Sequence, residues 1–343
     1  MWTAVRFTSQ IQPNAPLPAE DHSSSPILTN TRDERRTTVR RLTVLLLVCL
    51  PLFANAANVT VNCNLPAPLG KINIALKYMN PAGPNTITVI GTCKENVYIQ
   101  GFDRLTLIAK PGAVITDASG GQQWAVVYIS DSRRISIQGF TISGGNVGVR
   151  CENFSLCRFS GNTFTGTAQR GVDINDSDAT FSGDIFQNNS GQGIFAQSSH
   201  FTAAYLTLQN NQSGTFIMWS TVIGNNWTVS NNAQDGIFVA ATNFQLIDSN
   251  VYGNAWNGID AVDLSDLSLP NDTVTGNGYD GVYIGDTTKV AFNGGRYTGN
   301  GLVWGAPDIG CGEHYALADG IAGIYGNTNC PVPQVAAAQV KAK

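Results

Sequence analysis

A glycine recurs every 21 to 23 residues through the second half of the chain, and an apolar run follows each one. A unit of this length cannot bury its hydrophobic face alone, so neighbouring units must stack and share one continuous core. The glycines of the series are Gly148, Gly171, Gly193, Gly214, Gly236, Gly258 and Gly281.

Each period has room for two or three short strands between turns that are rich in Gly, Asn, Ser and Asp. Apolar residues alternate with a period of two, which argues against a helical repeat. An asparagine precedes five of the glycines by four residues, at Asn189, Asn210, Asn232, Asn254 and Asn277. We expect these amides to form a ladder between coils. The sequence therefore predicts an all-β fold, a single-stranded parallel β-helix with about 22 residues per coil.

The segment before the repeat adds a family resemblance. Gly70 to Met79 has the apolar spacing of a short amphipathic helix, and a strand, Gly91-Thr-Cys and Glu95-Asn-Val follow it. This order is similar to the capping helix and first coils of the pectate lyase-like superfamily of right-handed β-helices. The resemblance covers roughly residues 58–300, and it implies a right-handed solenoid whose N-terminal end is covered by a helix.

The N-terminus has the features of an export signal. Residues 1–38 are polar and charged, and we expect them to be disordered or a mis-annotated extension. Arg40-Arg41, an apolar run and Ala54-Asn-Ala predict a signal peptide over 39–56, too short for a membrane span of roughly 20 residues. The expected mature parts are a β-helix over 57–300, a C-terminal cap over 301–330 and a tail over 331–343.

Six cysteines remain after the predicted leader, an even number that favours disulfides in an oxidising compartment. Short loops favour the pairing 63–93, 151–157 and 311–330, one of 15 pairings that six cysteines allow. The protein is accordingly predicted to be secreted, periplasmic or displayed at the cell surface.

Charge is unevenly distributed along the predicted mature chain. Residues 57–170 carry 10 Lys and Arg against 5 Asp and Glu, whereas residues 171–343 carry 4 against 15. The acidic half argues against a nucleic-acid partner and suits cations or neutral ligands.

Strand alternation places the third residue of each post-glycine strand on the outer surface. The predicted outward row is Arg150, Asp173, Phe195, Phe216, Phe238, Asp260 and Tyr283. A second row at the strand ends includes Asp176, Ser198, Trp219, Ala241, Asp263 and Asp286. The aromatic members, Phe195, Phe216, Trp219, Phe238 and Tyr283, are candidates for stacking sugar rings or for an interaction with a partner.

Two groups of charged residues are candidate sites. Asp260, Asp263 and Asp286 fall on one face in adjacent coils, and close carboxylates raise one another's pKa as an acid/base pair requires. Polygalacturonase-like enzymes are similar in placing aspartates on adjacent coils, although their Asn-Thr-Asp, Gly-His-Gly and Arg-x-Lys signatures do not occur here. Arg150, Asp173 and Asp176 form the second patch, which resembles the carboxylate-bound Ca²⁺ and arginine of pectate lyases and so allows calcium as a cofactor.

Two classes of function follow. The first is a polysaccharide-binding protein, which as an enzyme would be a polysaccharide lyase or glycoside hydrolase. The alternative is a non-catalytic surface or adhesion scaffold. Fold alone does not decide between them. An open groove along the phenylalanine row favours a sugar site, and a segment covering that row favours the scaffold.

Overall fold

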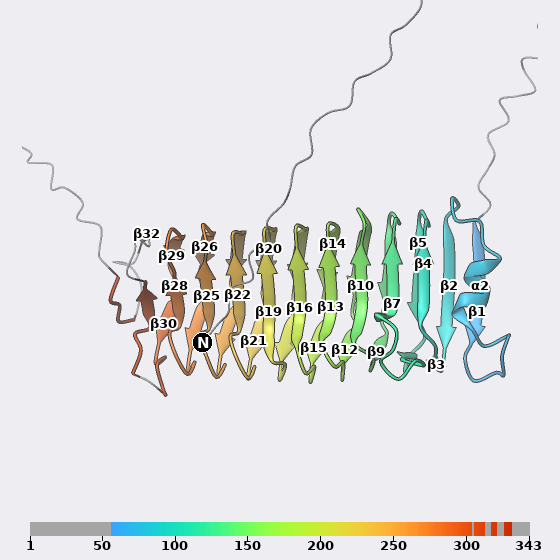
Figure 1. Ribbon diagram of the computed structural model, residues 1–343, viewed down its shortest axis with the longest axis horizontal. Coiled ribbons are helices and arrows are strands. Elements are labelled where there is room, and N and C mark those ends of the chain that lie inside the picture. Colours follow the sequence, from blue (N-terminus) through green and yellow to red (C-terminus); the bar gives the residue numbers. More distant parts are fainter. Residues whose placement is uncertain (1–55, 304, 313–316, 321–325, 331–343) are drawn as a thin grey trace, which may run out of the picture. The chain divides into compact units, whose positions relative to one another are not determined.

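The computed structural model describes residues 56–303, 305–312, 317–320 and 326–330, all within the unit Phe53–Lys343. The predicted extension and tail lie outside the described residues, as does the predicted leader apart from Ala56. The described chain winds into a parallel β-helix with three sheets, and its coils follow one another along the long axis (Figure 1).

The first sheet carries the strands that follow the repeat glycines. Its ten strands, in spatial order, are β4 (Val97–Gln100), β7 (Ala125–Ser130), β10 (Val147–Glu152), β13 (Arg170–Asn175), β16 (Gln192–Gln197), β19 (Ser213–Met218), β22 (Ile237–Ala240), β25 (Ile259–Val262), β28 (Val282–Ile284) and β31 (Ile309–Cys311).

The second sheet receives the chain after one turn. Its twelve strands are β1 (Ala57–Asn62), β2 (Asn85–Ile90), β5 (Leu105–Ala109), β8 (Ile135–Gln138), β11 (Leu156–Ser160), β14 (Asp178–Ser182), β17 (His200–Ala204), β20 (Thr221–Asn225), β23 (Asn243–Ile247), β26 (Asp266–Pro270), β29 (Lys289–Asn293) and β32 (Leu317–Asp319).

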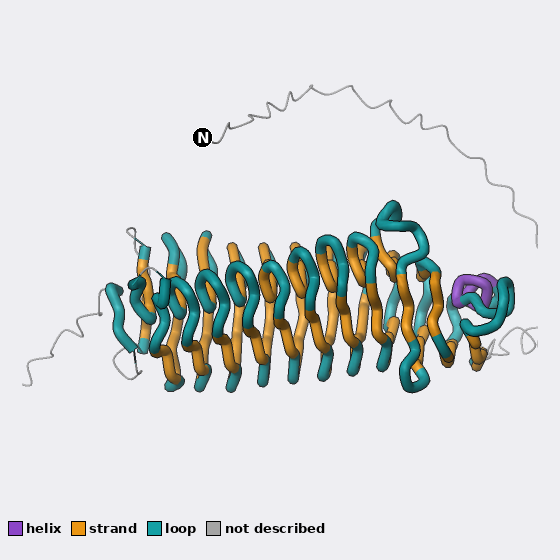
Figure 2. Tube along the Cα trace, turned by 90° about the horizontal axis from the view of Figure 1, so that it is seen from below, coloured by secondary structure: helices purple, strands orange, loops and turns teal. Residues whose placement is uncertain are grey.

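The third sheet completes each coil with three-residue strands. Its ten members are β3 (Thr92–Lys94), β6 (Val114–Thr116), β9 (Thr141–Ser143), β12 (Thr163–Thr165), β15 (Ile185–Gln187), β18 (Thr207–Gln209), β21 (Thr228–Ser230), β24 (Asn250–Tyr252), β27 (Thr273–Thr275) and β30 (Arg296–Thr298). Figure 2 shows how strands and turns alternate around each coil. The predicted fold class is confirmed, and β31 and β32 continue two sheets beyond residue 300.

The core is a set of side-chain stacks that run along the solenoid. Phe159 and Phe181 stack at 4.9 Å between ring centroids, and Phe164 and Phe186 stack at 4.8 Å. These separations equal the spacing of about 4.8 Å between neighbouring strands, so equivalent residues of successive coils pack directly on one another. A short strand thus buries its apolar side chain against its own repeats, as the sequence predicts.

The repeat glycines lie on one line because no side chain fits between the coils there. A Cβ atom on Gly193 would lie 2.7 Å from the carbonyl oxygen of Gly214, and one on Gly236 would lie 2.6 Å from that of Gly258. Both distances are too short for a methyl group. The regular spacing of these glycines in the sequence therefore follows from close backbone contact between coils.

The predicted asparagine ladder is present, with one correction. Asn189, Asn211, Asn232, Asn254 and Asn277 are buried, and each donates through Nδ2 to the side-chain oxygen of the next rung. The last acceptor among these is Asn300, whose own amide donates to Asp308 Oδ1 at 3.0 Å. Asn211 replaces the predicted Asn210, which lies in the turn with a φ of 55°. The coil from Gly193 to Gly214 is one residue shorter than its neighbours, and the missing residue falls between the ladder and the glycine.

The N-terminal end is covered by the single helix of the described residues, α2 (Ile72–Lys77), near the position that the sequence predicts. Glu95 of the adjoining coil accepts hydrogen bonds from the backbone N–H groups of Ile72 and Asn73, at 2.8 and 3.2 Å. A carboxylate at the N-terminal end of a helix accepts hydrogen bonds from the backbone N–H groups that have no partner within the helix.

The three disulfides pair as the short-loop prediction has them: Cys63–Cys93, Cys151–Cys157 and Cys311–Cys330. No helix among the described residues has the length and apolar character needed to cross a membrane.

Candidate functional site

The outward row of the first sheet has the register that the sequence predicts. Arg150 pairs with Asp173, Asp173 with Phe195, and the pairing continues through Phe216 and Phe238 to Asp260 and Tyr283. These side chains are therefore neighbours at the spacing of adjacent strands.

The phenylalanine row forms a stack on the sheet surface. Phe195 and Phe216 lie 5.8 Å apart between centroids, and Phe216 and Phe238 lie 4.4 Å apart. The guanidinium carbon of Arg170 lies 3.5 Å above the Phe195 ring, which is buried. The row does not line the groove described below. Its rings stack on one another, and Arg170 covers the first of them.

The second predicted patch is a closed network of charges. Asp173 is fully buried and accepts hydrogen bonds from Arg150 Nη1 at 3.2 Å, from Arg170 Nη1 at 2.7 Å and from Asn175. Arg150 also bonds Glu152, which accepts from the Tyr128 hydroxyl. Two guanidinium groups already surround Asp173, so these residues do not fit a calcium ion.

Asp176, the third predicted member of this patch, lies apart from the network. It follows Asp173 by three residues, about 10 Å along a strand, and sits exposed in the next turn with a φ of 45°.

The acidic patch has a different membership from the predicted one. Asp260 has Asp235 and Asp280 as its charged neighbours, and Asn257 lies among them: its backbone N–H donates to Asp235 Oδ1 at 3.0 Å and its amide donates to Asp260 Oδ2 at 3.3 Å. Burial, reinforced by the charge of Asp235, raises the pKa of Asp260 to about 7. Burial likewise raises the pKa of Asp235 and of Asp280 to about 6.

The other two predicted carboxylates lie at the strand-end turns. Asp263 is exposed with a φ of 53°, about 10 Å along the chain from Asp260. Asp286 is also exposed, and a methyl group at Gly312 would lie 3.0 Å from its Oδ1 and 3.1 Å from the Tyr283 hydroxyl oxygen. The side chains of Asp286 and Tyr283 therefore both lie close to Gly312 in the last coils.

Neither patch gathers three free metal ligands. Within the described part of the chain, the one group of three Cys, His, Asp or Glu donors within 4.8 Å of one another is Cys63, Cys93 and Glu95. Its two sulfurs form a disulfide and its carboxylate caps α2.

A groove of about 750 Å³ runs along the turns that join the first sheet to the second. Its lining comes from five consecutive coils, from Phe154 to Asn243, a length of about 19 Å at the coil spacing. Trp219 and Phe154 are 60% and 83% exposed, and Asp176, Asp178 and His200 contribute polar groups. His200 Nδ1 lies 3.9 Å from Asp178 Oδ1. Trp219 and Asp176, which the sequence assigned to different sites, thus belong to one groove.

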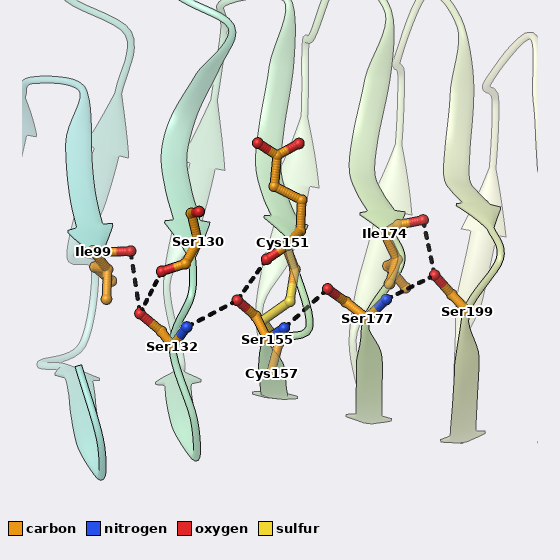
Figure 3. The surroundings of a disulfide bond; sticks show 10 residues. Ile99, Ser130, Ser132, Cys151, Ser155, Cys157, Ile174, Ser177 and Ser199 are labelled. Atoms are coloured by element: carbon orange, nitrogen blue, oxygen red, sulfur yellow. Dashed lines mark hydrogen bonds between the residues drawn. A yellow bond between two sulfur atoms is a disulfide. The ribbon is translucent and has the colours of Figure 1, made fainter. Parts of the chain in front are cut away.

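Buried hydroxyls hold the floor of this groove. The backbone N–H of Ser155 donates to Ser177 Oγ at 3.1 Å, that of Ser177 to Ser199 Oγ at 3.3 Å, and that of Ser199 to Ser220 Oγ at 3.1 Å. Figure 3 shows the first of these rungs beside the Cys151–Cys157 disulfide. Such a ladder fixes the spacing of the turns before any ligand arrives.

Both exposed aromatics of the groove have strained backbones. Trp219 has a φ of 50° and Phe154 a φ of 56°, a left-handed conformation that costs a bulky residue roughly 1–2 kcal/mol. Exposure of a large ring and backbone strain are both unfavourable for folding, and such combinations are concentrated at functional sites.

Sequence reasoning missed several members of these sites. Asp235 and Asp280 directly precede repeat glycines, where alternation predicts no outward side chain, yet both are charged neighbours of Asp260. Arg170 occupies the same position one residue before Gly171. Phe154 gave no sequence signal, because it is the extra residue of a longer turn. His200 gave none, because the equivalent positions of the adjacent coils are Asp178 and Thr221, which share no residue type with it.

The model of a family described as "Right handed beta helix region" matches residues 124–294. The crystal structure of pectate lyase Pel9A matches with a TM-score of 0.59 and 15% identity, over 81% of this chain and 79% of that one. The chain is a right-handed β-helix protein. The A-module of mannuronan C-5 epimerase AlgE6 from Azotobacter vinelandii is similar to this β-helix protein with a TM-score of 0.56 and 15% identity, over 73% and 79% of the two chains. No curated protein sequence matches it. At this identity the likeness is one of fold.

Proposed function

We propose that this β-helix protein is an exported carbohydrate-binding protein whose groove between the first and second sheets holds a glycan. The observation that carries the proposal is the groove itself, which follows the solenoid axis over five coils and presents Trp219 and Phe154 to solvent. An aromatic ring offers a flat apolar surface, and the hydroxyls and carboxylates beside it offer hydrogen bonds. A linear polymer of sugar rings matches this combination.

The charge of the groove favours a neutral glycan. Asp176 and Asp178 line it together with His200, and no lysine or arginine occurs among its described lining residues. A chain of anionic sugars would meet two carboxylates there, and like charges in a confined site repel each other. The acidic second half of the sequence likewise suits cations or neutral ligands rather than anionic ones.

The structural neighbours support a carbohydrate ligand in general terms, since one is a pectate lyase and another a mannuronan epimerase. Export is supported by the predicted signal peptide over 39–56 and by three disulfides, which persist in oxidising compartments. Mass spectrometry of the exported product tests this part: a mature N-terminus near Ala57 is expected, and one upstream of Arg40 would contradict it.

Binding is tested by calorimetry with neutral oligosaccharides and with uronate oligosaccharides of equal length. We expect neutral ligands to bind, and Trp219→Ala to weaken them about tenfold, which corresponds to about 1.4 kcal/mol. Tyr205→Ala is the matched control, because Tyr205 is also exposed, has a φ of 58° and lies outside the groove. Tight binding of uronates in place of neutral sugars would refute the assignment. Failure of every saccharide would favour the scaffold function.

A second candidate function, hydrolysis or elimination on the face of the first sheet, is supported by the carboxyl groups around Asp260. A carboxyl group with a pKa of about 7 can give or take a proton at neutral pH, as acid/base catalysis requires. Asp263 and Asp286 remain candidate catalytic residues from the sequence. Phe216, Phe238 and Tyr283 remain candidate substrate-binding residues.

Single asparagine variants separate these candidates. In an assay of bond cleavage, loss of about 10²-fold in Asp260→Asn with near-normal rates in Asp263→Asn and Asp286→Asn would assign the chemistry to the cluster of Asp260. The reverse pattern would assign it to the strand-end carboxylates. Full activity in all three would place the chemistry elsewhere.

A further inference from the structure

The groove lies between two turns that are longer than the four turns between them, all of which join the first sheet to the second. At four consecutive coils the turn has one left-handed residue: Asp176, Ser198, Trp219 and Ala241. In the coil before these it has two, Asn153 and Phe154, with φ values of 57° and 56°. In the coil after them it again has two, Asp263 and Leu264, with φ values of 53° and 62°.

Hydrogen bonding confirms that these two turns contain an extra residue. In the short turns the buried hydroxyl donates to the carbonyl oxygen two residues back, as Ser199 does to Gln197 at 2.7 Å. In the long turns the hydroxyl donates three residues back. Ser155 bonds the Glu152 carbonyl oxygen and Ser265 bonds that of Val262, each at 2.6 Å.

Each extra residue projects a large side chain into solvent. Phe154 is 83% exposed and forms the first end of the groove lining. Leu264 is 74% exposed and lies in the coil directly beyond Asn243, where the lining ends. The hydroxyl ladder continues beneath both turns, so the extra residue moves outward rather than into the core.

The turn that carries Phe154 is held more firmly than its neighbours. The Cys151–Cys157 disulfide joins the residues on either side of it, and both cysteines are buried (Figure 3). The backbone N–H of Phe154 donates to the carbonyl oxygen of Asp176 in the next coil, at 2.8 Å, and the neighbouring turns make the equivalent bond, so the disulfide is what distinguishes this turn. A turn that is closed by a disulfide is rigid, because the disulfide removes alternative conformations of the turn.

We infer that Phe154 and Leu264 close the groove at its two ends, so that it binds a short oligosaccharide or a chain end in preference to the interior of a long polymer. This inference rests on the proposed glycan-binding function. A glycan that continues past Phe154 or Leu264 must rise away from the groove floor there, and the sugar units beyond that side chain gain no contact with the four short turns. The interior of a long polymer must rise away at both ends of the groove, whereas a chain end must do so at one end only.

The test measures affinity against chain length for one neutral glycan series. For the unchanged protein we expect affinity to rise with length until the glycan spans about 19 Å and then to stay level. Leu264→Gly should extend that rise to longer chains, because it removes the side chain that closes the groove and glycine adopts its positive φ freely. Tyr205→Gly, at another exposed left-handed turn, is the control.

The outcomes separate the inference from the function on which it rests. Affinity of the unchanged protein that keeps rising with length beyond the groove would overturn the closed ends and leave glycan binding intact. A level profile that Leu264→Gly does not extend would overturn the role of Leu264 as a wall. Absence of binding at every length would overturn the proposed function, and the inference with it.

Discussion

Asp272 allows the cost of a single buried carboxyl group in this solenoid to be measured. It is fully buried, its Oδ1 accepts the Ser249 backbone N–H at 2.8 Å, and its Oδ2 has no hydrogen-bond partner. Burial raises the pKa of Asp272 from 3.8 to about 8; the charge of Asp248 adds to this and the bond from Ser249 opposes it. At neutral pH the group therefore holds a proton in the folded protein and releases it on unfolding.

The sign of the pH dependence follows from this difference. Between about pH 4 and pH 8 the folded state binds one more proton than the unfolded state, so the free energy of unfolding falls as pH rises through that range. One pH unit corresponds to about 1.4 kcal/mol, so holding this proton at pH 7 costs folding about 4 kcal/mol.

Asp272→Asn removes the cost because an amide is neutral at every pH. Asn162 occupies the corresponding turn of an earlier coil and donates to the Ile137 carbonyl oxygen at 2.9 Å, so an amide fits this position. At pH 7 we expect the variant to be more stable by about 4 kcal/mol, seen as a rise in Tm of roughly 5–10 °C.

Thermal melts at pH 7 and pH 4.5 check this, with Asp266→Asn as an exposed control that should change stability by less than about 1 kcal/mol. The gain should shrink toward pH 4.5. Equal Tm values for the variant and the unchanged protein at pH 7, with both folded, would refute the burial argument.

Three further predictions, one of them with a control substitution, test the fold and the sheet face. Gly236→Ala places a methyl 2.6 Å from the Gly258 carbonyl oxygen, and denaturant titration should show a loss of about 1–3 kcal/mol. Asn232→Ala leaves two rungs of the ladder unpaired and should cost about 1–3 kcal/mol, whereas Asn210→Gly should cost almost nothing. Asp173→Ala strips two guanidinium groups of their buried partner and should lower stability by about 3–5 kcal/mol in the same titration; an unchanged midpoint would contradict the network.

The periodic features could be predicted from the sequence because they depend on contacts that every coil repeats. The glycine line, the outward row and the asparagine ladder each need one residue type at one position, so their spacing is visible in the letters. The short loops of the cysteines likewise limited the disulfide pairing. The error at Asn210 arose where one coil is shorter, since a fixed offset from Gly214 does not say on which side the residue is missing.

The sites were harder to predict because they depend on departures from the repeat. Strand alternation hid Asp235 and Asp280, which are neighbours of the outward Asp260 although alternation assigns the residue before each repeat glycine to the inner face. The network around Asp173 includes Arg170, and the presence of two guanidinium groups there could not be inferred from Arg150 alone. The groove could not be predicted because it depends on how far each turn projects from the solenoid, and the sequence does not reveal that projection.

The stacking of near-identical coils has a consequence for how such a binding site could change over generations. Each coil contacts its two neighbours through the same backbone bonds, the same glycine line and the same ladders, so a whole coil is a unit that could be duplicated or lost without breaking register. Phe154 and Leu264 would keep their places at the ends of the groove. The site would simply lengthen or shorten by about 4.8 Å, one step for each coil gained or deleted between them.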